Sequence, residues 1–362
     1  YDVFDYDPLK YVTERVNLRE HVVWSHPPNT EETQAMAEDY LSLGITRASK
    51  SETPEPKITD LNRTILVVGG GVTGLTAAIE AAKAGSQVVL VEKEAELGGW
   101  AKKMYKVLPT KAPFSELEKP AIDTKIAAAN GNENIKIYTS TTIKKIAGEP
   151  GMYDVTVEKG GSEETFTIGA IIYAIGWKPY DASKLDNLGY GKFKNVVTNV
   201  EMEEIALNGK IARPSDGKPA QSVVFVQCAG QRDEAHVPYC SSVCCNVSLK
   251  QAMYVRESNP DAGAYIIYKD MRTPGLYENF YKAAQDDEGI FLAKGEILGI
   301  EEEADGSLLV EVNNLLLGKT VRIKADIVVL ATGMLTNMIP EDYEVNNLTT
   351  EYIGTITKKE TT

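Results

Sequence analysis

The chain has 362 residues, of which 43% are hydrophobic and 25% charged, a composition typical of a soluble globular protein with room for two hydrophobic cores. Its formal net charge of −14 argues against a nucleic-acid partner, because the phosphate backbone would be repelled. No apolar run approaches the roughly 20 residues of a membrane-spanning helix, so we expect no direct membrane span. The first residue is Tyr1 rather than Met, so we expect a fragment of a longer protein.

Residues 1–63 are predicted to form an N-terminal leader and linker. Hydrophobic residues recur at helical spacing over Thr30–Leu43, and either Asn29 or Thr30 is a suitable N-cap. The proline-rich stretch Ser51–Lys57 reads as a linker that enters the next domain. The leader is therefore expected to be short and helical.

A glycine-rich turn follows the leader. Ile65–Val68 predicts a buried strand, Leu75–Ala84 a helix and Gln87–Val91 a second strand. Between the first strand and the helix lies a G-x-G-x-x-G pattern made of Gly69, Gly71 and Gly74. In such a turn the first glycine permits a tight bend and the second lets the backbone approach a pyrophosphate. The third permits close packing of helix and strand, and the N-terminus of the helix faces the anion.

The end of the second strand indicates which dinucleotide binds. Glu92 lies where a carboxylate would accept hydrogen bonds from a ribose hydroxyl. The run from Glu92 and Lys93 to the pair Gly98-Gly99, followed by Trp100, resembles the FAD-binding pattern of flavoproteins more than a nicotinamide site. The sequence therefore favours FAD.

The pattern continues as expected for a flavoprotein with two dinucleotide-binding domains. We predict a helix, a strand and then a hairpin joined by Gly160-Gly161; these elements are Phe114–Ala129, Ile135–Thr139, Tyr153–Lys159 and Glu164–Ile168. Two strands that end in A-x-G patterns, Ala170–Gly176 and Asp326–Gly333, resemble the crossover points where such proteins leave and re-enter the FAD domain.

These strands divide the chain. The predicted fold is α/β, a thioredoxin-reductase-like, Rossmann-type flavoprotein preceded by the helical leader. The FAD domain comprises residues 64–197 and 326–362, and a degenerate nucleotide-binding domain comprises residues 198–325. The candidate FAD-binding residues are Gly69, Gly71, Val72, Thr73, Gly74, Glu92, Lys93, Gly98, Gly99, Trp100, Ala174, Gly176 and Gly333.

The second domain begins another βαβ unit, with predicted elements Ser222–Gln227, Ser241–Glu257 and Ala264–Tyr268. Its first turn has one glycine in place of the G-x-G-x-x-G pattern. A Cβ atom at Cys228 would crowd a pyrophosphate, and Asp233 would repel it. We therefore predict that this domain has lost its nicotinamide site.

The four cysteines of the chain are concentrated in this unit, at Cys228, Cys240, Cys244 and Cys245. A disulfide framework would spread them out, so the clustering favours a metal or redox site in a reducing compartment. With Cys240 and Cys244 on one face of the predicted helix start, the thiolates suit a tetrahedral sulfur site or a [4Fe–4S] cluster. A zinc site and a redox disulfide between two of the cysteines remain alternatives.

Four segments together resemble the family of A-type subunits of heterodisulfide reductases, namely NLREHVVWSH, GGGVTG, RPSDGK and the block CAGQRDE…YCSSVCC…LKQA. This resemblance implies FAD beside a [4Fe–4S] cluster on the four cysteines, and a lysine at the position of Lys250 next to the flavin ring. From the residues alone, a solvent-facing helix lysine is the alternative for Lys250. Because no C-x2-C-x2-C run occurs, we expect the ferredoxin-like insertion of the family to be absent, and we expect the same of its terminal ferredoxin and partner-docking domains.

Within that family, the sequence most resembles members from the quinone-interacting membrane-bound oxidoreductases of sulfate reducers. The implied protein is a cytoplasmic electron-transfer subunit that is attached to the membrane through other subunits of a redox complex, with adenylylsulfate reductase as a partner. It would exchange two electrons at the flavin and one at the cluster. The alternatives are an NAD(P)H-dependent flavoprotein disulfide reductase and a cofactor-poor structural subunit.

Overall fold

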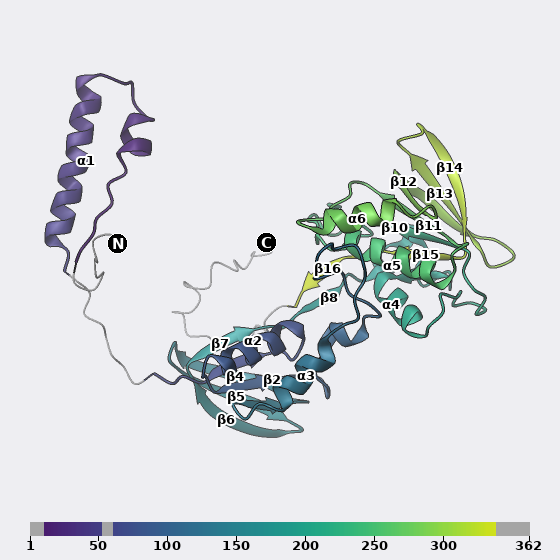
Figure 1. Ribbon diagram of the computed structural model, residues 1–362, viewed down its shortest axis with the longest axis horizontal. Coiled ribbons are helices and arrows are strands. Elements are labelled where there is room, and N and C mark those ends of the chain that lie inside the picture. The colour runs from purple at the N-terminus through teal and green to yellow at the C-terminus, as the bar shows by residue number, and fades with distance from the viewer. Residues whose placement is uncertain (1–10, 53–60, 338–362) are drawn as a thin grey trace. The chain divides into compact units, whose positions relative to one another are not determined.

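The computed structural model describes residues 11–52 and 61–337 (Figure 1). The chain divides into two compact units, Tyr1–Asp60 and Leu61–Thr362. Most of the predicted linker Ser51–Lys57 and the final stretch of the predicted FAD domain, residues 338–362, lie outside the described residues.

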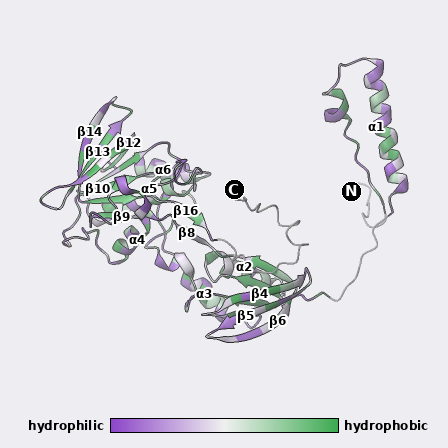
Figure 2. Cartoon of the chain, turned by 180° about the vertical axis from the view of Figure 1, so that it is seen from behind, coloured by the Kyte–Doolittle hydropathy of each residue, from purple (hydrophilic) through white to green (hydrophobic). Residues whose placement is uncertain are grey.

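The N-terminal unit contains a π-helix, η1 (Arg19–Val23), and a long helix, α1 (Glu31–Lys50). The Thr30 hydroxyl caps α1 by accepting a 3.2 Å hydrogen bond from the Thr33 N–H. The predicted helix is confirmed and extends further than expected. Apolar and polar residues are mixed along α1 (Figure 2), and none of the described helices has the length and apolar composition that crossing a membrane requires.

The first sheet of the main unit is parallel, in the order β3-β2-β1-β7. Its strands are β1 (Ile65–Val68), β2 (Val88–Val91), β3 (Ile135–Tyr138) and β7 (Ala170–Tyr173). Helices α2 (Val72–Lys83) and α3 (Ile122–Asn130) cover one face, and the antiparallel strands β4 (Thr142–Glu149), β5 (Met152–Lys159) and β6 (Ser162–Ile168) cover the other (Figure 1). Alternate residues of β1 serve the two faces, since Val67 packs with the helices and Leu66 with β4–β6.

Two local predictions have different outcomes. The hairpin is confirmed, because Lys159 pairs with Ser162 across Gly160 and Gly161. The helix predicted over Phe114–Ala129 is wrong in its first half, since α3 begins only at Ile122. Phe114 has a φ of 61°, outside the helical region, and Pro120 disfavours a helical residue before it.

The second sheet has the order β14-β13-β12-β11-β10-β15-β9. Its strands are β9 (Val196–Thr198), β10 (Ser222–Val226), β11 (Gly263–Tyr268), β12 (Ile290–Glu302), β13 (Leu308–Asn314), β14 (Lys319–Ala325) and β15 (Ile327–Leu330). The first three of these in sequence, with β15 and the start of β12, are parallel, and β12–β14 continue as an antiparallel meander. The predicted βαβ unit is present as β10, α5 (Cys244–Ser258) and β11.

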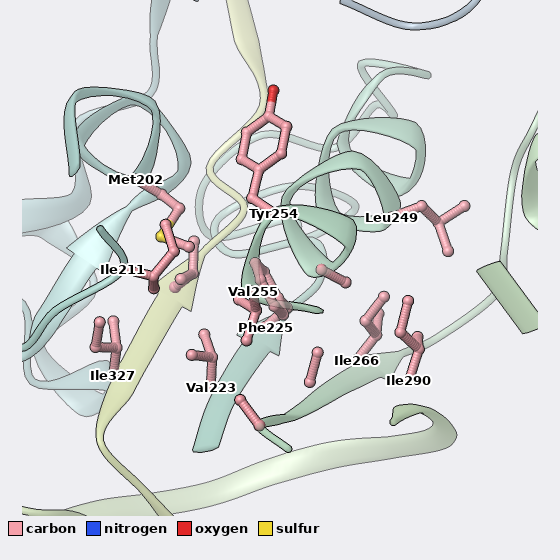
Figure 3. Packing of buried hydrophobic residues seen from close by; sticks show 14 of the residues in the cluster. Met202, Ile211, Val223, Phe225, Leu249, Tyr254, Val255, Ile266, Ile290 and Ile327 are labelled. Atoms are coloured by element: carbon pink, nitrogen blue, oxygen red, sulfur yellow. The ribbon is translucent and has the colours of Figure 1, made fainter. Parts of the chain in front are cut away.

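Helices α4 (Asn199–Leu207), α5 and α6 (Tyr277–Gln285) pack on one face of this sheet through a large apolar cluster (Figure 3). Short 3₁₀ helices lie at η2 (Gly99–Lys103), η3 (Ala182–Lys184) and η4 (Asp186–Leu188). A two-stranded ribbon pairs β8 (Trp177–Pro179) with β16 (Met334–Thr336).

The sheets do not divide at the predicted residues. Strand β9 pairs with β15, and β15 pairs with β10, so both belong to the second sheet. The sequence prediction had placed Val196, Val197 and Ile327–Leu330 in the FAD domain. The A-x-G pattern therefore marks the end of a strand in each sheet, and the chain leaves the first sheet only after β7. Which cofactor each part binds stays a prediction.

Candidate functional site

The glycine-rich turn between β1 and α2 leaves room for a ligand at one position only. A Cβ atom on Gly69, whose φ is 106°, would lie 2.3 Å from the carbonyl oxygen of Ala174. A Cβ atom on Gly74 would lie 1.8 Å from the carbonyl oxygen of Gly69. By contrast, a Cβ atom on Gly71 would meet nothing within 4 Å. The first and third glycines are thus required by the protein's own packing, and the second borders open space.

That open space lies at the N-terminus of α2. Gly71 is the N-cap and provides no side-chain cap, and the helix begins with Val72 and Thr73. The first N–H groups of a helix lack partners within the helix and carry a partial positive charge. Both residues are exposed. Their backbone N–H groups are therefore free to bind an anion such as a pyrophosphate.

Glu92 borders the same turn. It is 7% exposed, and its Oε2 accepts a 2.6 Å hydrogen bond from the Gly70 N–H while its Oε1 accepts one of 2.9 Å from the Glu94 N–H. A carboxylate has about four lone-pair positions, so both oxygens can accept further bonds, such as those from ribose hydroxyls. Lys93 is instead exposed and lies 3.8 Å from the Glu94 carboxylate.

The loop that carries Gly98, Gly99 and Trp100 lies against the turn. The Gly98 N–H donates a 2.8 Å hydrogen bond to the Gly70 carbonyl. A Cβ atom on Gly99 would lie 3.2 Å from the Gly71 Cα. Trp100 stacks on Trp177, with ring centroids 4.7 Å apart, and its indole N–H donates to the Trp177 carbonyl. We call residues 98–103 the flavin loop, because the sequence predicts that Gly98, Gly99 and Trp100 bind FAD.

The A-x-G residues are divided between two places. The Ala174 N–H donates a 2.8 Å hydrogen bond to the Val68 carbonyl, which puts Ala174 beside the glycine-rich turn. The Gly176 carbonyl accepts a 3.4 Å hydrogen bond from the Asn337 N–H. A Cβ atom on Gly333 would lie 2.6 Å from Gln231 and 2.7 Å from Ser241. Gly333 therefore packs against the loop that carries the cysteines.

The residues of the first turn fit FAD. The open approach at Gly71, the free amides of Val72 and Thr73 and the buried carboxylate of Glu92 match the pyrophosphate and ribose of a dinucleotide. The assignment of individual residues to FAD stays a prediction.

The cysteines lie between β10 and the start of α5. Cys228 follows β10, and Cys244 and Cys245 are the first residues of α5. The prediction that Cys240 and Cys244 share a helical face is wrong, because Cys240 lies in the preceding loop. Ser242 has a φ of 58°, which a right-handed helix does not allow, so α5 cannot extend back through this residue. The Ser241 hydroxyl instead donates a 2.6 Å hydrogen bond to Gln231 Oε1.

The four thiols nevertheless lie within electrostatic range of one another. Burial, together with negative charge on Cys228, Cys245 and Cys240, raises the pKa of the Cys244 thiol to about 12. Burial also raises the pKa values of Cys228 and Cys245. Such thiols stay protonated at neutral pH unless a metal binds them, because metal binding removes the proton.

Several neighbours suit an anionic cluster. The Arg232 guanidinium offsets part of the rise in the pKa of Cys228, and the backbone of Arg272 does so for Cys245. The buried side-chain amide of Gln227, next to Cys228 in sequence, has no hydrogen-bond partner within residues 11–52 and 61–337. An inorganic sulfide would accept a bond from such a donor. The donor set, four soft sulfurs with cationic neighbours, fits a [4Fe–4S] cluster.

Within the described ranges, no group of three or more His, Cys, Asp or Glu side chains is arranged to hold a single metal ion. A four-iron cluster is a different case, because each thiolate binds a different iron atom. The cluster and the disulfide alternative therefore stay predictions, whereas the described residues are not arranged for the zinc alternative.

Lys250 is 4% exposed, so the solvent-facing alternative is wrong. Its Nζ lies 3.0 Å from Glu203 Oε1, donates a 2.9 Å hydrogen bond to the Lys106 carbonyl and lies 3.8 Å from Met104 Sδ. Burial lowers the pKa of Lys250, and the charge of Glu203 partly offsets this effect. Lys250 therefore contacts the segment that directly follows the flavin loop.

The turn after β10 differs from the turn after β1. Residues 227–243 separate β10 from α5, whereas residues 69–71 separate β1 from α2. Cys228 occupies a left-handed conformation, with a φ of 56°, and Asp233 binds its own loop by accepting from the Ala235 N–H at 3.0 Å. The helix N-terminus is therefore not presented directly after the strand, as a pyrophosphate site requires.

Part of the chain matches a known protein family. Residues 39–208 match the family described as pyridine nucleotide-disulphide oxidoreductase. The chain has the fold of a flavin-dependent oxidoreductase. The predicted fold class is confirmed by this match and by the two Rossmann-type sheets. The predicted enzyme class stays a proposal.

Curated relatives match a larger part of the chain than this family model does. The chain is 30% identical to the A-type subunit of the H(2)/formate:CoB-CoM heterodisulfide,ferredoxin reductase of Methanococcus maripaludis, over 90% of this chain and 61% of the relative. It is 28% identical to the A-type iron-sulfur subunit of the CoB–CoM heterodisulfide reductase of Methanocaldococcus jannaschii, over 90% of this chain and 62% of the relative. The chain thus spans about three-fifths of the length of these curated relatives.

Among solved structures, the thioredoxin reductase of Lactococcus lactis aligns with a TM-score of 0.48 and 16% identity, covering 75% of this chain and 78% of that one. The thioredoxin reductase of T. acidophilum aligns with a TM-score of 0.47 and 16% identity, covering 76% and 79%.

Sequence reasoning missed two sets of residues. Trp177, which stacks on Trp100, gave only the weak signal of following the A-x-G strand end. Glu203 and Tyr254, which surround Lys250, gave no signal beyond their places on helices, because their partners lie far away in the sequence.

Proposed function

We propose that this protein is an electron-transfer subunit that binds FAD at the turn of Gly69, Gly71 and Gly74 and a [4Fe–4S] cluster at its four cysteines. The single observation that carries the proposal is that one chain contains both an open glycine turn after β1 and four neighbouring thiols between β10 and the start of α5. The names of the relatives, which are A-type subunits of heterodisulfide reductases, support it.

The residues of the chain have separate tasks in this proposal. The amides of Val72 and Thr73 bind the pyrophosphate, and Glu92 orients the ribose. When bound, FAD supplies two-electron chemistry and the cluster one-electron chemistry, so that together they convert between the two. Cys228, Cys240, Cys244 and Cys245 hold the iron. The Lys250 ammonium places a positive charge near the flavin loop, which favours negative charge there.

The finer proposal concerns the complex. We propose that the protein serves a quinone-interacting membrane-bound oxidoreductase of the kind found in sulfate reducers, joining quinol to adenylylsulfate reductase. It would be a cytoplasmic subunit, held at the membrane by its partner subunits. The resemblance of the sequence segments supports this assignment, and the heterodisulfide reductase names of the relatives favour a multisubunit redox complex.

A second candidate is an NAD(P)H-dependent disulfide reductase. The matching family description, pyridine nucleotide-disulphide oxidoreductase, favours it. The long connection 227–243 and the side chain at Cys228 oppose it, because they leave no glycine-lined approach for a second dinucleotide.

Visible and EPR spectra of the full-length protein, purified without oxygen, test the proposal. Flavin bands together with broad iron–sulfur absorption and a cluster EPR signal on reduction are expected. Flavin without iron would favour the disulfide reductase. A colourless protein would contradict both enzymes and support a structural subunit.

A further inference from the structure

The segment that follows the flavin loop is bound by three buried side chains from two helices. The segment is Met104–Lys106, and the side chains are Glu203 of α4 and Lys250 and Tyr254 of α5. Their residues are 2%, 4% and 2% exposed, respectively. We call these three side chains the clamp.

The clamp side chains form hydrogen bonds with the backbone of this segment. Glu203 Oε2 accepts a 3.1 Å hydrogen bond from the Tyr105 N–H. Lys250 Nζ donates a 2.9 Å bond to the Lys106 carbonyl. The Tyr254 hydroxyl accepts a 3.1 Å bond from the Lys106 N–H and lies 3.1 Å from the Lys106 carbonyl oxygen. Because the backbone is bound at consecutive residues, the position of the chain is fixed.

The clamp is also tied together internally. Glu203 Oε1 lies 3.0 Å from Lys250 Nζ and accepts a 2.7 Å bond from Gln251 Nε2. The Tyr254 hydroxyl lies 3.2 Å from Glu203 Oε2. The Tyr254 ring lies in the apolar cluster between the second sheet and helices α4, α5 and α6, while its hydroxyl points away from that cluster (Figure 3). A buried ion pair is a poor source of stability, because removing both charges from water costs about as much as their attraction returns. Its best-attested use is to fix one packing arrangement.

The clamp stands between the two candidate cofactor sites. On one side, the flavin loop touches the glycine turn through the Gly98 N–H and Gly99. On the other, the helix that carries Lys250 and Tyr254 begins with Cys244 and Cys245. The clamp therefore joins the segment that directly follows the flavin loop to α5, which we call the cysteine helix.

We propose that Glu203 and Tyr254 are positioning residues. They hold the segment that directly follows the flavin loop against the cysteine helix, α5, and so set the separation of the flavin and the cluster. This role rests on the proposed function, although the clamp itself does not need either cofactor. When bound, the flavin and the cluster would supply a one-electron transfer in which no bond forms or breaks, and the part of Glu203 and Tyr254 would be to hold the backbone at Tyr105 and Lys106 in place.

The first test is hydrogen exchange of the backbone amides of Tyr105 and Lys106 in the full-length protein. Tyr254→Phe removes one oxygen and keeps the ring in the core, so we expect these amides to exchange about tenfold faster. Tyr190→Phe is the matched control, because its hydroxyl donates a 3.0 Å bond to Glu201 of the same α4 helix and does not touch the clamp. Unchanged exchange at residues 105 and 106 in Tyr254→Phe would overturn the clamp.

The second test is the rate at which electrons reach the cluster after the flavin has been photoreduced in the presence of a sacrificial organic electron donor, which is oxidised in that step. Tyr254→Phe and Glu203→Gln should slow this step several-fold while flavin and iron contents stay the same, and Tyr190→Phe should not. An unchanged rate in variants whose amides have opened would overturn the positioning role. If Glu203→Gln fails to fold, Tyr254→Phe carries the test alone. Full-length protein that binds no flavin or no iron would contradict the proposed function and, with it, the positioning role. The exchange rates of the Tyr105 and Lys106 amides would still show whether the clamp binds this segment.

Discussion

Gly74, in the first turn of α2, packs so closely on Gly69 that a Cβ atom would lie 1.8 Å from the Gly69 carbonyl oxygen. Gly71, between them, has open space where its own Cβ would lie. The two positions thus require glycine for different physical reasons. Gly74 serves the packing of helix on strand, and Gly71 serves the approach of a ligand.

This difference predicts separable effects of substitution. Gly71→Val should fold normally, because its φ of −78° suits any residue and no atom obstructs the side chain. It should lose FAD, because the side chain occupies the place of the pyrophosphate. Gly74→Ala should instead lower the free energy of unfolding by about 1–3 kcal/mol or more, through overpacking. Thermal unfolding and flavin content of both variants check this. A folded Gly71→Val protein with a full complement of FAD would refute the assignment.

The cysteine site predicts a uniform response to substitution. Serine at any one of Cys228, Cys240, Cys244 or Cys245 removes a soft thiolate, so iron should fall from about four per chain. Flavin content should remain, because no cysteine belongs to the first sheet. Iron and sulfide analysis of the four single variants checks this, with Ser242→Ala, an exposed neighbour in the same loop, as the control. Unchanged iron in all four variants would rule out the cluster at these residues.

Lys250→Met tests the role of the buried cation. It should lower the flavin potential by about 30 mV, equivalent to about 1.4 kcal/mol, because a positive charge no longer favours the reduced anion. It also leaves Glu203 buried without its cation, which should cost about 3–5 kcal/mol of stability. The double variant Lys250→Met, Glu203→Gln controls for that cost, since neither charge remains. Spectroelectrochemistry with an unshifted flavin couple in both proteins would separate Lys250 from the flavin.

The sequence could predict the first turn because the constraints there are local. The glycines, the apolar strands and Glu92 lie within one βαβ unit, so their spacing alone specifies how they meet. The same holds for the hairpin at Gly160 and Gly161, where turn chemistry fixes the register.

The parts that could not be predicted depend on distant residues. Helix α5 begins at Cys244 rather than at the predicted Ser241. The Ser241 side chain bonds instead to Gln231 and to the Met334 carbonyl, partners that helical periodicity does not reveal. Glu203 of α4 meets Lys250 of α5, and Tyr254 meets Lys106, which lies 148 residues away in the sequence. Such pairs are fixed by how the layers pack, which no local pattern contains.

The turn after β10 predicts that neither NADH nor NADPH reduces this protein. The side chain at Cys228 crowds the place of a pyrophosphate, and residues 227–243 separate the strand from the helix N-terminus that would bind it. With FAD bound and oxygen excluded, either nucleotide should leave the flavin absorbance unchanged over minutes, whereas dithionite, which needs no binding site, should bleach it. A Cys228→Gly variant is an informative companion, because it removes the Cβ atom but leaves the long connection in place, and we expect it to stay unreactive as well. Rapid bleaching of the wild-type flavin by micromolar nucleotide, a concentration at the low end of ordinary enzyme KM values, would show that the second domain has kept its nicotinamide site.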